Sequence, residues 1–163
     1  MFRIRAYSEA DWPAVWAVLE PVFRAGETYA FSPRISESEA WRVWVDQPKA
    51  TYVAEDAKGN LKGTYYIKPN QPELGAHVCN CGYVVSADAQ GQGIGSGLCE
   101  HSLETARALG FTAMQYNLVV ETNQGAIRLW ERHGFQVIGR LPGAFRHPVQ
   151  GYVDALVMYQ WLD

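Results

Sequence analysis

The stretch QGQGIGSG, residues 90–97, constrains the possible folds of this chain more than any other part of its sequence. Four glycines stand at every second position, and the amphipathic run LCEHSLETARALG follows directly. Glycine lowers the stability of a regular element, so such a run indicates that another group approaches the main chain closely. Successive backbone N–H groups at the positive end of a helix dipole form an anion site, for which a phosphate ester is the expected ligand.

Two common phosphate-binding loops do not match this stretch. The G-x-G-x-x-G fingerprint fails because Ser96 lies three residues after Gly93 and Leu98 lies three residues after Gly95. No Gly-Lys-Ser/Thr triplet follows, as a P-loop requires. A tight turn with glycines present only for packing would explain one glycine better than four. The pattern therefore favours a pyrophosphate held by main chain, without metal or lysine.

The pattern of apolar residues predicts one mixed α/β (α+β) domain that covers residues 1–163. Runs rich in β-branched and aromatic residues predict strands at 2–7, 51–54, 61–67, 77–85, 111–120, 135–139 and 152–161. Apolar residues three and four positions apart predict helices that begin near residues 12, 37, 96 and 124. The order β-α-α-β-β-β-α-β-α-β-β then gives a mixed sheet with helices on its faces.

Composition and charge exclude several classes of function. The formal net charge is −3 and the lysines and arginines are scattered, so we do not expect nucleic acid as a partner. No apolar run approaches ~20 residues and the first residues lack a signal-peptide core, so we expect a cytoplasmic protein without a membrane partner. Cys79, Cys81 and Cys99 are interpreted as reduced packing residues, and no metal site is expected.

Two motifs resemble those of the GNAT-superfamily N-acetyltransferases. Residues 84–95, VVSADAQGQGIG, are similar to the stretch that contains that family's acetyl-CoA signature, Gln/Arg-x-x-Gly-x-Gly/Ala. Residues 123–135, NQGAIRLWERHGF, are similar to its Asn-x-x-Ala-x-x-Leu-Tyr-Glu-x-x-Gly-Phe block, at the separation that the fold needs. The resemblance implies acetyl-CoA as cosubstrate and a mainly antiparallel sheet of six or seven strands. The implied cofactor-binding residues are Val84, Val85, Gln90, Gly91, Gln92, Gly93, Ile94, Gly95, Ser96, Asn123, Ala126 and Trp130.

The resemblance also implies how acetyl transfer proceeds. In the family, the strand before the glycine run has a bulge and diverges from the next parallel strand, which leaves a slot for the pantetheine arm. Backbone groups near Val84 and Val85 would pair with pantetheine amides and with the developing oxyanion. The amine attacks the thioester directly, so no protein acyl intermediate forms and the cysteines are not needed as nucleophiles.

The sequence departs from the family pattern at two catalytic positions. Trp130 stands where the family usually has a tyrosine that acts as general acid, and an indole N–H has no useful acidity. A thiol pKa of about 8.5 makes CoA a good leaving group, so this loss is tolerable. The fourth strand lacks the glutamate that many relatives carry, and offers His77 and Asn80 instead.

Four residues are candidates for catalysis and for acceptor binding. Asn80 and Asn117 are polar residues within apolar strands, where a buried amide needs partners. The stretch 117–119 is similar to that of yeast-type N-acetyltransferases acting on azetidine-2-carboxylate and other proline analogues, which implies that both asparagines orient a small imino or amino acid. Glu27 and Tyr29 resemble the substrate side of GNAT folds, where Glu27 would hold or deprotonate the amine. Exposed edge asparagines and a solvated loop acid are the alternatives.

The hypothesis is therefore an acetyl-CoA-dependent N-acetyltransferase for the amine of a small, amino-acid-like substrate. One alternative is an acyl-CoA-binding sensor without turnover, which Trp130 and the missing glutamate favour slightly. Another is an enzyme that acetylates a protein N-terminus or lysine, although the aromatic-rich first loop suggests a closed, small pocket. A homodimer through the final strands is also expected from the resemblance.

Overall fold

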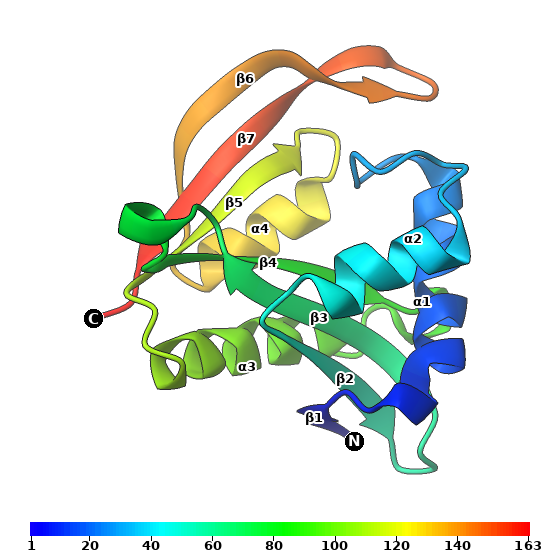
Figure 1. Ribbon diagram of the computed structural model, residues 1–163. Helices are drawn as coiled ribbons and strands as arrows, with labels where there is room; N and C mark the ends of the chain where they lie inside the picture. Colours follow the sequence, from blue (N-terminus) through cyan, green and yellow to red (C-terminus); the bar gives the residue numbers. More distant parts are fainter.

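Seven strands form one sheet in the computed structural model, which describes residues 1–163 (Figure 1). The strands are β1 (Phe2–Ala6), β2 (Ala50–Asp56), β3 (Leu61–Pro69), β4 (Val78–Val85), β5 (Ala113–Val120), β6 (Gln136–His147) and β7 (Gly151–Trp161). They lie in the order β1-β2-β3-β4-β5-β7-β6, and only the β4–β5 pair is parallel. The predicted mixed, mainly antiparallel sheet is confirmed.

Helices cover both faces of this sheet. They are α1 (Trp12–Ala25), α2 (Glu37–Trp41), α3 (Ile94–Ala108) and α4 (Gln124–Arg132). A π-helical turn, Arg42–Asp46, continues α2, and 3-10 turns occupy Glu9–Asp11, Glu73–Gly75 and Ala87–Ala89. Local chemistry fixes the helix ends: Asn123 Oδ1 accepts the N–H of Ala126 at the start of α4, and Gly26 with φ 64° ends α1. The predicted order of helices and strands is confirmed.

Side chains alternate across the sheet and fill two hydrophobic cores. Cys79 and Cys81 of β4 belong to the core beneath α3 and α4. Val84 of the same strand and Tyr66 of β3 belong to the core beneath α1 and α2. We call these two sides the α3–α4 face and the α1–α2 face. The even-numbered side chains of β4 therefore point to the α1–α2 face, and the odd-numbered ones to the α3–α4 face.

The neighbouring strands β4 and β5 separate soon after they begin. They are paired at only two positions, at the start of each strand. The register of β3 against β4 is unbroken, whereas that of β5 against β7 shifts between Tyr116 and Val119. The bulge expected in the strand before the glycine run is therefore wrong. The expected gap beside that strand is present, and it arises because β5 leaves the regular pairing.

The last hairpin is longer than the sequence predicted. We expected a strand at 135–139 and then a connection, whereas β6 continues to His147. Its pairing with β7 shifts register twice, and Gly143 with φ 59° donates its N–H to Asp154 Oδ1 at 2.9 Å. The stretch LPGAF, residues 141–145, reads as a turn in the sequence, but in the structure it forms a bulge within an edge strand.

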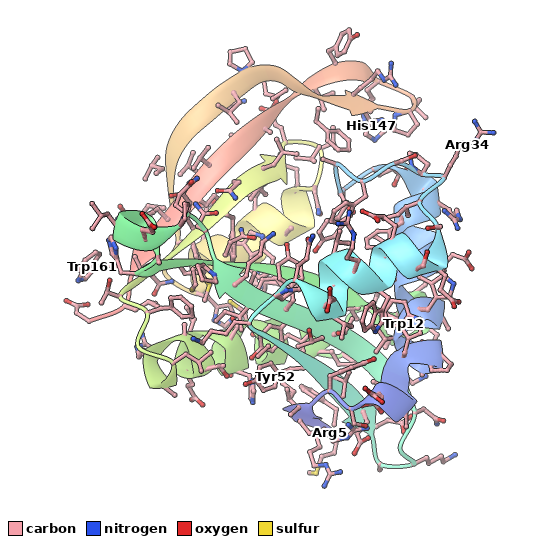
Figure 2. The ribbon with its side chains drawn as sticks, viewed as in Figure 1. Arg5, Trp12, Arg34, Tyr52, His147 and Trp161 are labelled. Atoms are coloured by element: carbon pink, nitrogen blue, oxygen red, sulfur yellow. The ribbon has the colours of Figure 1, made fainter.

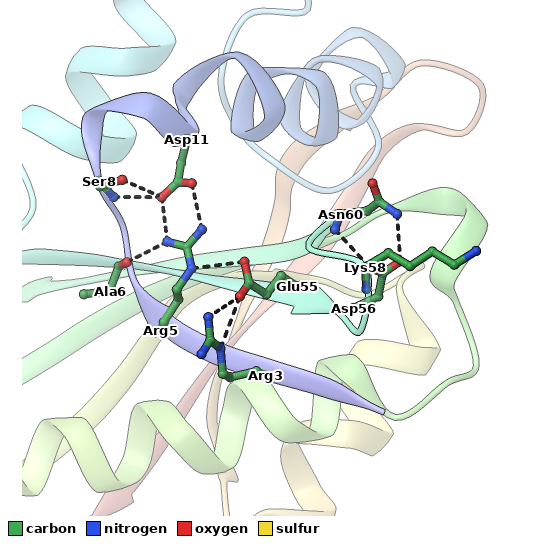
Figure 3. A network of polar contacts seen from close by, with 9 residues as sticks. All are labelled: Arg3, Arg5, Ala6, Ser8, Asp11, Glu55, Asp56, Lys58 and Asn60. Atoms are coloured by element: carbon green, nitrogen blue, oxygen red, sulfur yellow. Dashed lines mark hydrogen bonds and ion pairs between the residues drawn. The ribbon is translucent and has the colours of Figure 1, made fainter.

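An ion network joins β1 to β2 and to the start of α1 (Figure 3). The guanidinium of Arg5 donates to the two carboxylate oxygens of Asp11 at 2.8 and 2.9 Å, and its Nε donates to Glu55 at 3.1 Å. Arg3 also pairs with Glu55. The hydrogen bond from Arg5 stabilises the carboxylate of Asp11 and lowers its pKa to about 2.

Candidate active site

A cavity of about 880 Å³ lies where β4 and β5 separate. Its walls come from β4, β5, the start of α3, α4 and the loop that follows α1. No aspartate, glutamate or histidine lines this cavity, and its charged side chains are Lys68, Arg128 and Arg132. The cavity is therefore positively charged in a chain whose formal net charge is −3.

The backbone of β4 presents every second peptide group to the gap. The N–H of Ser86, just after the strand, donates to Lys62 O at 2.8 Å, so the even-numbered residues face β3. Tyr83 faces the other way: its N–H donates to the Tyr29 hydroxyl at 2.7 Å, and its C=O accepts from the same hydroxyl at 2.8 Å. The residues whose backbone faces the gap are thus Cys81, Tyr83 and Val85.

This alternation separates the roles of two neighbouring valines. Val85 O lies on the free edge, where it accepts a hydrogen bond from Gln90 Nε2 at 3.1 Å. Val84 directs its backbone toward β3, and its side chain is part of the core on the α1–α2 face. Val84 therefore contributes a side chain to the cavity wall, and the expectation that its backbone faces the pantetheine arm is corrected.

The glycine run divides into two pairs with different roles. Gly91 and Gly93 have φ of 76° and 82°, and a Cβ atom added to either would meet nothing within 4 Å. Gly95 and Gly97 lie inside α3: a Cβ at Gly95 would lie 3.3 Å from Leu129 of α4, and one at Gly97 would lie 2.6 Å from the ring of Phe2. The first pair leaves the main chain open to a ligand, and the second pair lets α4 and β1 pack closely against α3.

The start of α3 fits a diphosphate. The helix begins at Ile94, two residues earlier than expected, and its first internal hydrogen bond runs from Gly97 N–H to Gly93 O at 3.0 Å. The preceding N–H groups are therefore free to bind an anion at the positive end of the helix. The predicted residues that line the cavity here are Gln90, Gly91, Gly93, Ile94, Gly95 and Ser96, whereas Gln92 does not line it.

Sequence reasoning missed two arginines beside this turn. Arg128 and Arg132 lie one turn apart on α4, line the cavity and form no ion pair. Two arginines four positions apart within the second motif were the available signal. Their placement next to free N–H groups adds charge to the anion site.

Trp130 and Asn123 also line the cavity from α4. The indole of Trp130 packs against Tyr83 and Tyr116 with ring centroids 4.8 and 4.9 Å apart, and its N–H makes no hydrogen bond within the protein. The Tyr116 hydroxyl lies 2.8 Å from that of Tyr83, which contacts Ser102 Oγ at 2.7 Å. Burial raises the pKa of both tyrosines well above the usual value, so both hydroxyls keep their protons near neutral pH.

Two predicted asparagines lie in the cavity on either side of the gap. Asn80 is buried where β4 and β5 begin to separate, and its Nδ2 donates across the gap to Gln115 O at 2.9 Å. Asn117 of β5 is exposed; its Nδ2 donates to Asn70 Oδ1 at 2.7 Å and its Oδ1 accepts from Gln115 Nε2 at 3.0 Å. Both amides thus have partners in the protein and face the same cavity.

A lysine that the sequence did not reveal lies beside Asn80. Lys68 is its register partner on β3 and lines the cavity. The ammonium of Lys68 lies 5.3 Å from the centre of the Tyr66 ring. Strand pairing brings Lys68 to the site, and no spacing pattern in the sequence shows that pairing.

The structure does not bring Glu27 to this site. Glu27 is exposed, forms no hydrogen bond and does not line the cavity. The chain turns at Gly26, after which Tyr29 and Phe31 pack inward against Phe23 with centroids 5.7 and 5.1 Å away. Because the aromatic residues take the inward positions, Glu27 points outward, and its assignment as base and substrate ligand is corrected. Tyr29 does line the cavity.

The structure shows whether side chains are grouped to bind a metal ion and whether a helix could span a membrane. No three His, Cys, Asp or Glu side chains are grouped so that they could bind a metal ion. No helix of the structure has both the length and the apolar character needed to cross a bilayer.

A gap between parallel strands beside a helix start with free N–H groups is the arrangement that the resemblance to acetyltransferases led us to expect. The family model of the acetyltransferase (GNAT) family matches residues 12–135. The chain belongs to this family.

Individual relatives agree with this assignment. A GCN5-related N-acetyltransferase from Kribbella flavida is 41% identical with a TM-score of 0.94, and the match covers 99% of this chain and 98% of that one. N-acetyltransferase aca1 of Schizosaccharomyces pombe is 41% identical over 115 residues, 70% of this chain and 54% of the relative. The putative phosphinothricin acetyltransferase YwnH of Bacillus subtilis is 28% identical over 147 residues, 86% of this chain and 87% of the relative. The chain thus spans about half the length of aca1 and most of the length of YwnH.

Proposed function

We propose that this acetyltransferase acetylates the amine of a small, amino-acid-like compound by direct attack on the thioester. The observation that carries the proposal is the pair of amides, Asn80 and Asn117, on the two walls of the gap. They offer hydrogen-bond donors and acceptors to a small polar acceptor on the α1–α2 face. The name of YwnH as a putative phosphinothricin acetyltransferase supports a compact, amino-acid-like acceptor.

The donor side of the site assigns separate tasks to main chain and side chains. The free N–H groups at the start of α3, with Arg128 and Arg132, would hold the diphosphate. The free edge of β4 at Val85 would pair with pantetheine amides once Gln90 releases Val85 O. Once the Tyr29 hydroxyl releases the N–H of Tyr83, that N–H would face the thioester oxygen and stabilise the negative charge that develops on it.

The chemistry needs no acyl-enzyme. The amine nitrogen forms a bond to the thioester carbon, the carbon–sulfur bond breaks, and CoA leaves as a thiolate. Because no carboxylate or imidazole lines the cavity, the amine proton passes to water, and the acceptor reacts as the free base. Asn80 and Asn117 orient the acceptor and take up no proton, because an amide is not a base at these pH values.

The experiment that tests this proposal combines thiol release with mass spectrometry. The chain is incubated with acetyl-CoA and a panel of amino acids, proline analogues including azetidine-2-carboxylate, polyamines and peptides with a free N-terminus. We expect acetylation of amino-acid-like acceptors, and a loss in Asn80→Ala and Asn117→Ala that lies mainly in KM for the acceptor. Acetylation of peptides alone would contradict the proposal, and acetyl-CoA binding without any thiol release would favour a sensor.

We further infer that two copies of the chain pair through the outer hairpin. The edge strand β6 exposes Val137 and Ile138, and β7 exposes Tyr152, with 45%, 58% and 75% of their surface accessible. Figure 2 shows His147 and Trp161 at opposite ends of this hairpin. Apolar side chains on an unpaired edge favour association with another copy. Sedimentation equilibrium should give a dimer and Ile138→Glu a monomer, whereas a monomeric wild type would refute the inference.

We also infer one domain over residues 1–163, because every strand joins one sheet. A cytoplasmic location is inferred from the three buried free thiols, Cys79, Cys81 and Cys99, which are typical of a reducing compartment.

A further inference from the structure

We propose that the ammonium of Lys68 binds a carboxylate of the acceptor, so that the enzyme acts on amino acids and rejects amines that lack an anionic group. This inference rests on the acetyl transfer proposed above and names the recognition element for its substrate class.

The ammonium of Lys68 lies against an aromatic ring in the wall of the cavity. It lies 5.3 Å from the centre of the Tyr66 ring, and that ring lies directly on Gly82, where an added Cβ would be 2.4 Å from a ring carbon. Gly82 is flanked by Cys81 and Tyr83, whose backbone faces the gap. The Tyr66 ring therefore contacts both β4 at Gly82 and the ammonium, and the charge of Lys68 lies on the α1–α2 face of the sheet, in the wall of the cavity.

Lys68 lacks a counter-ion. None of the ion pairs involves it, whereas Lys62, at the other end of the same strand, pairs with Asp88 at 2.9 Å. The cavity that Lys68 lines contains no aspartate or glutamate. A cation in such a site repels polyamines and other cationic acceptors, and attracts an anion.

The other two cationic side chains of the cavity would bind the diphosphate of the donor. Arg128 and Arg132 lie on α4, next to the anion-binding turn and on the α3–α4 face. Lys68 shares a face with Asn80, its register partner, on the opposite side of the sheet. The charge of Lys68 is therefore available to the acceptor, whose amine must approach the thioester from that side.

The test compares each accepted amino acid with its own carboxamide, which keeps the amine but lacks the charge. We expect the wild type to prefer the amino acid about 30-fold in kcat/KM, as one charge-assisted contact provides. The carboxamide amine is the weaker base and is more fully uncharged near pH 8, so basicity would favour the carboxamide. Lys68→Met should remove the preference through KM for the amino acid and leave the carboxamide unchanged, and Lys68→Arg should keep most of it.

Lys49→Met is the matched control. The ammonium of Lys49 lies 6.0 Å from the Phe111 ring, a similar cation–π contact outside the cavity, so this variant should keep the preference. Equal use of carboxamides or polyamines by the wild type, or equal losses for both acceptors in Lys68→Met, would overturn the inference. Calorimetric binding of the same ligand pairs to the CoA-loaded chain gives a second readout. If no amine is acetylated, the proposed function fails, and an amino-acid preference in binding that Lys68→Met abolishes would still support the carboxylate site.

Discussion

Trp130 stands where the family motif has a tyrosine that acts as general acid, but an indole N–H cannot act as one. Its indole lies between two tyrosine rings and makes no hydrogen bond, so its contribution is packing. We expect Trp130→Phe to keep kcat within about threefold, because a thiolate with a pKa of about 8.5 leaves without an acid. The lost apolar area should lower the free energy of unfolding by about 1–2 kcal/mol. Steady-state kinetics and urea denaturation measure both quantities, and a 100-fold fall in kcat at unchanged stability would show that the indole N–H acts on sulfur.

The absence of a base among the cavity residues predicts an unusual pH dependence. Since only the uncharged amine reacts, kcat/KM for the acceptor should rise about tenfold per pH unit until the pH reaches the amine's own pKa, and then level off. The apparent pKa should therefore change when an acceptor with a more or less basic amine is used. Initial rates over a pH series with two such acceptors provide the test. A single apparent pKa shared by both acceptors would indicate a protein base instead.

Single residues differed in how far the sequence revealed them. Asn80 could be recognised because a polar residue interrupts an apolar strand, and the structure shows it bridging the two walls of the gap. Lys68 could not be recognised from the sequence, because its place in the site depends on which residue of the neighbouring strand lies opposite it. Glu27 was assigned from its position in the loop, but the direction of its side chain depends on how Tyr29 and Phe31 pack, which local sequence does not encode.

At the scale of elements, the start of α3 combines binding and packing in one glycine run. Gly93→Ala places a side chain at φ 82° beside the diphosphate site, so KM for acetyl-CoA should rise, with a conformational cost of about 1–2 kcal/mol. Gly97→Ala meets the ring of Phe2 and lies outside the cavity, so it should lower Tm and leave that KM unchanged. Equal effects of both variants on KM would contradict this division.

Regular elements were predictable where periodicity and caps agree, as in α1, which ends at Gly26, and α4, which begins after Asn123. Two irregular features could not be predicted from the sequence. The stretch 141–145 carries strong turn signals, yet pairing with β7 makes it part of β6. The displaced strand at the gap is β5, although the glycine run drew attention to β4. In both cases long-range pairing outweighs the local signal.

At the scale of the whole molecule, the network in Figure 3 should govern acid stability. Because the folded pKa of Asp11 is lowered to about 2 from 3.8, its stabilisation is complete well above pH 3.8 and is lost as the pH falls through 2. We expect Asp11→Asn to lower the free energy of unfolding at pH 7 by about 1–2 kcal/mol, after allowance for solvent screening, and to match the wild type near pH 2. Chemical denaturation across this range measures the difference, and a constant difference down to pH 2 would refute the assignment.

The positively charged lining of the cavity has a consequence for turnover. Two of its cations, Arg128 and Arg132, attract the polyanionic donor, but the spent CoA keeps every phosphate when it has given up its acetyl group. Release of this product must therefore overcome the same attraction that captured the donor, and ionic strength acts on both steps at once. Added salt would slow capture and speed release, which places the rate of the cycle under the control of the surrounding electrolyte.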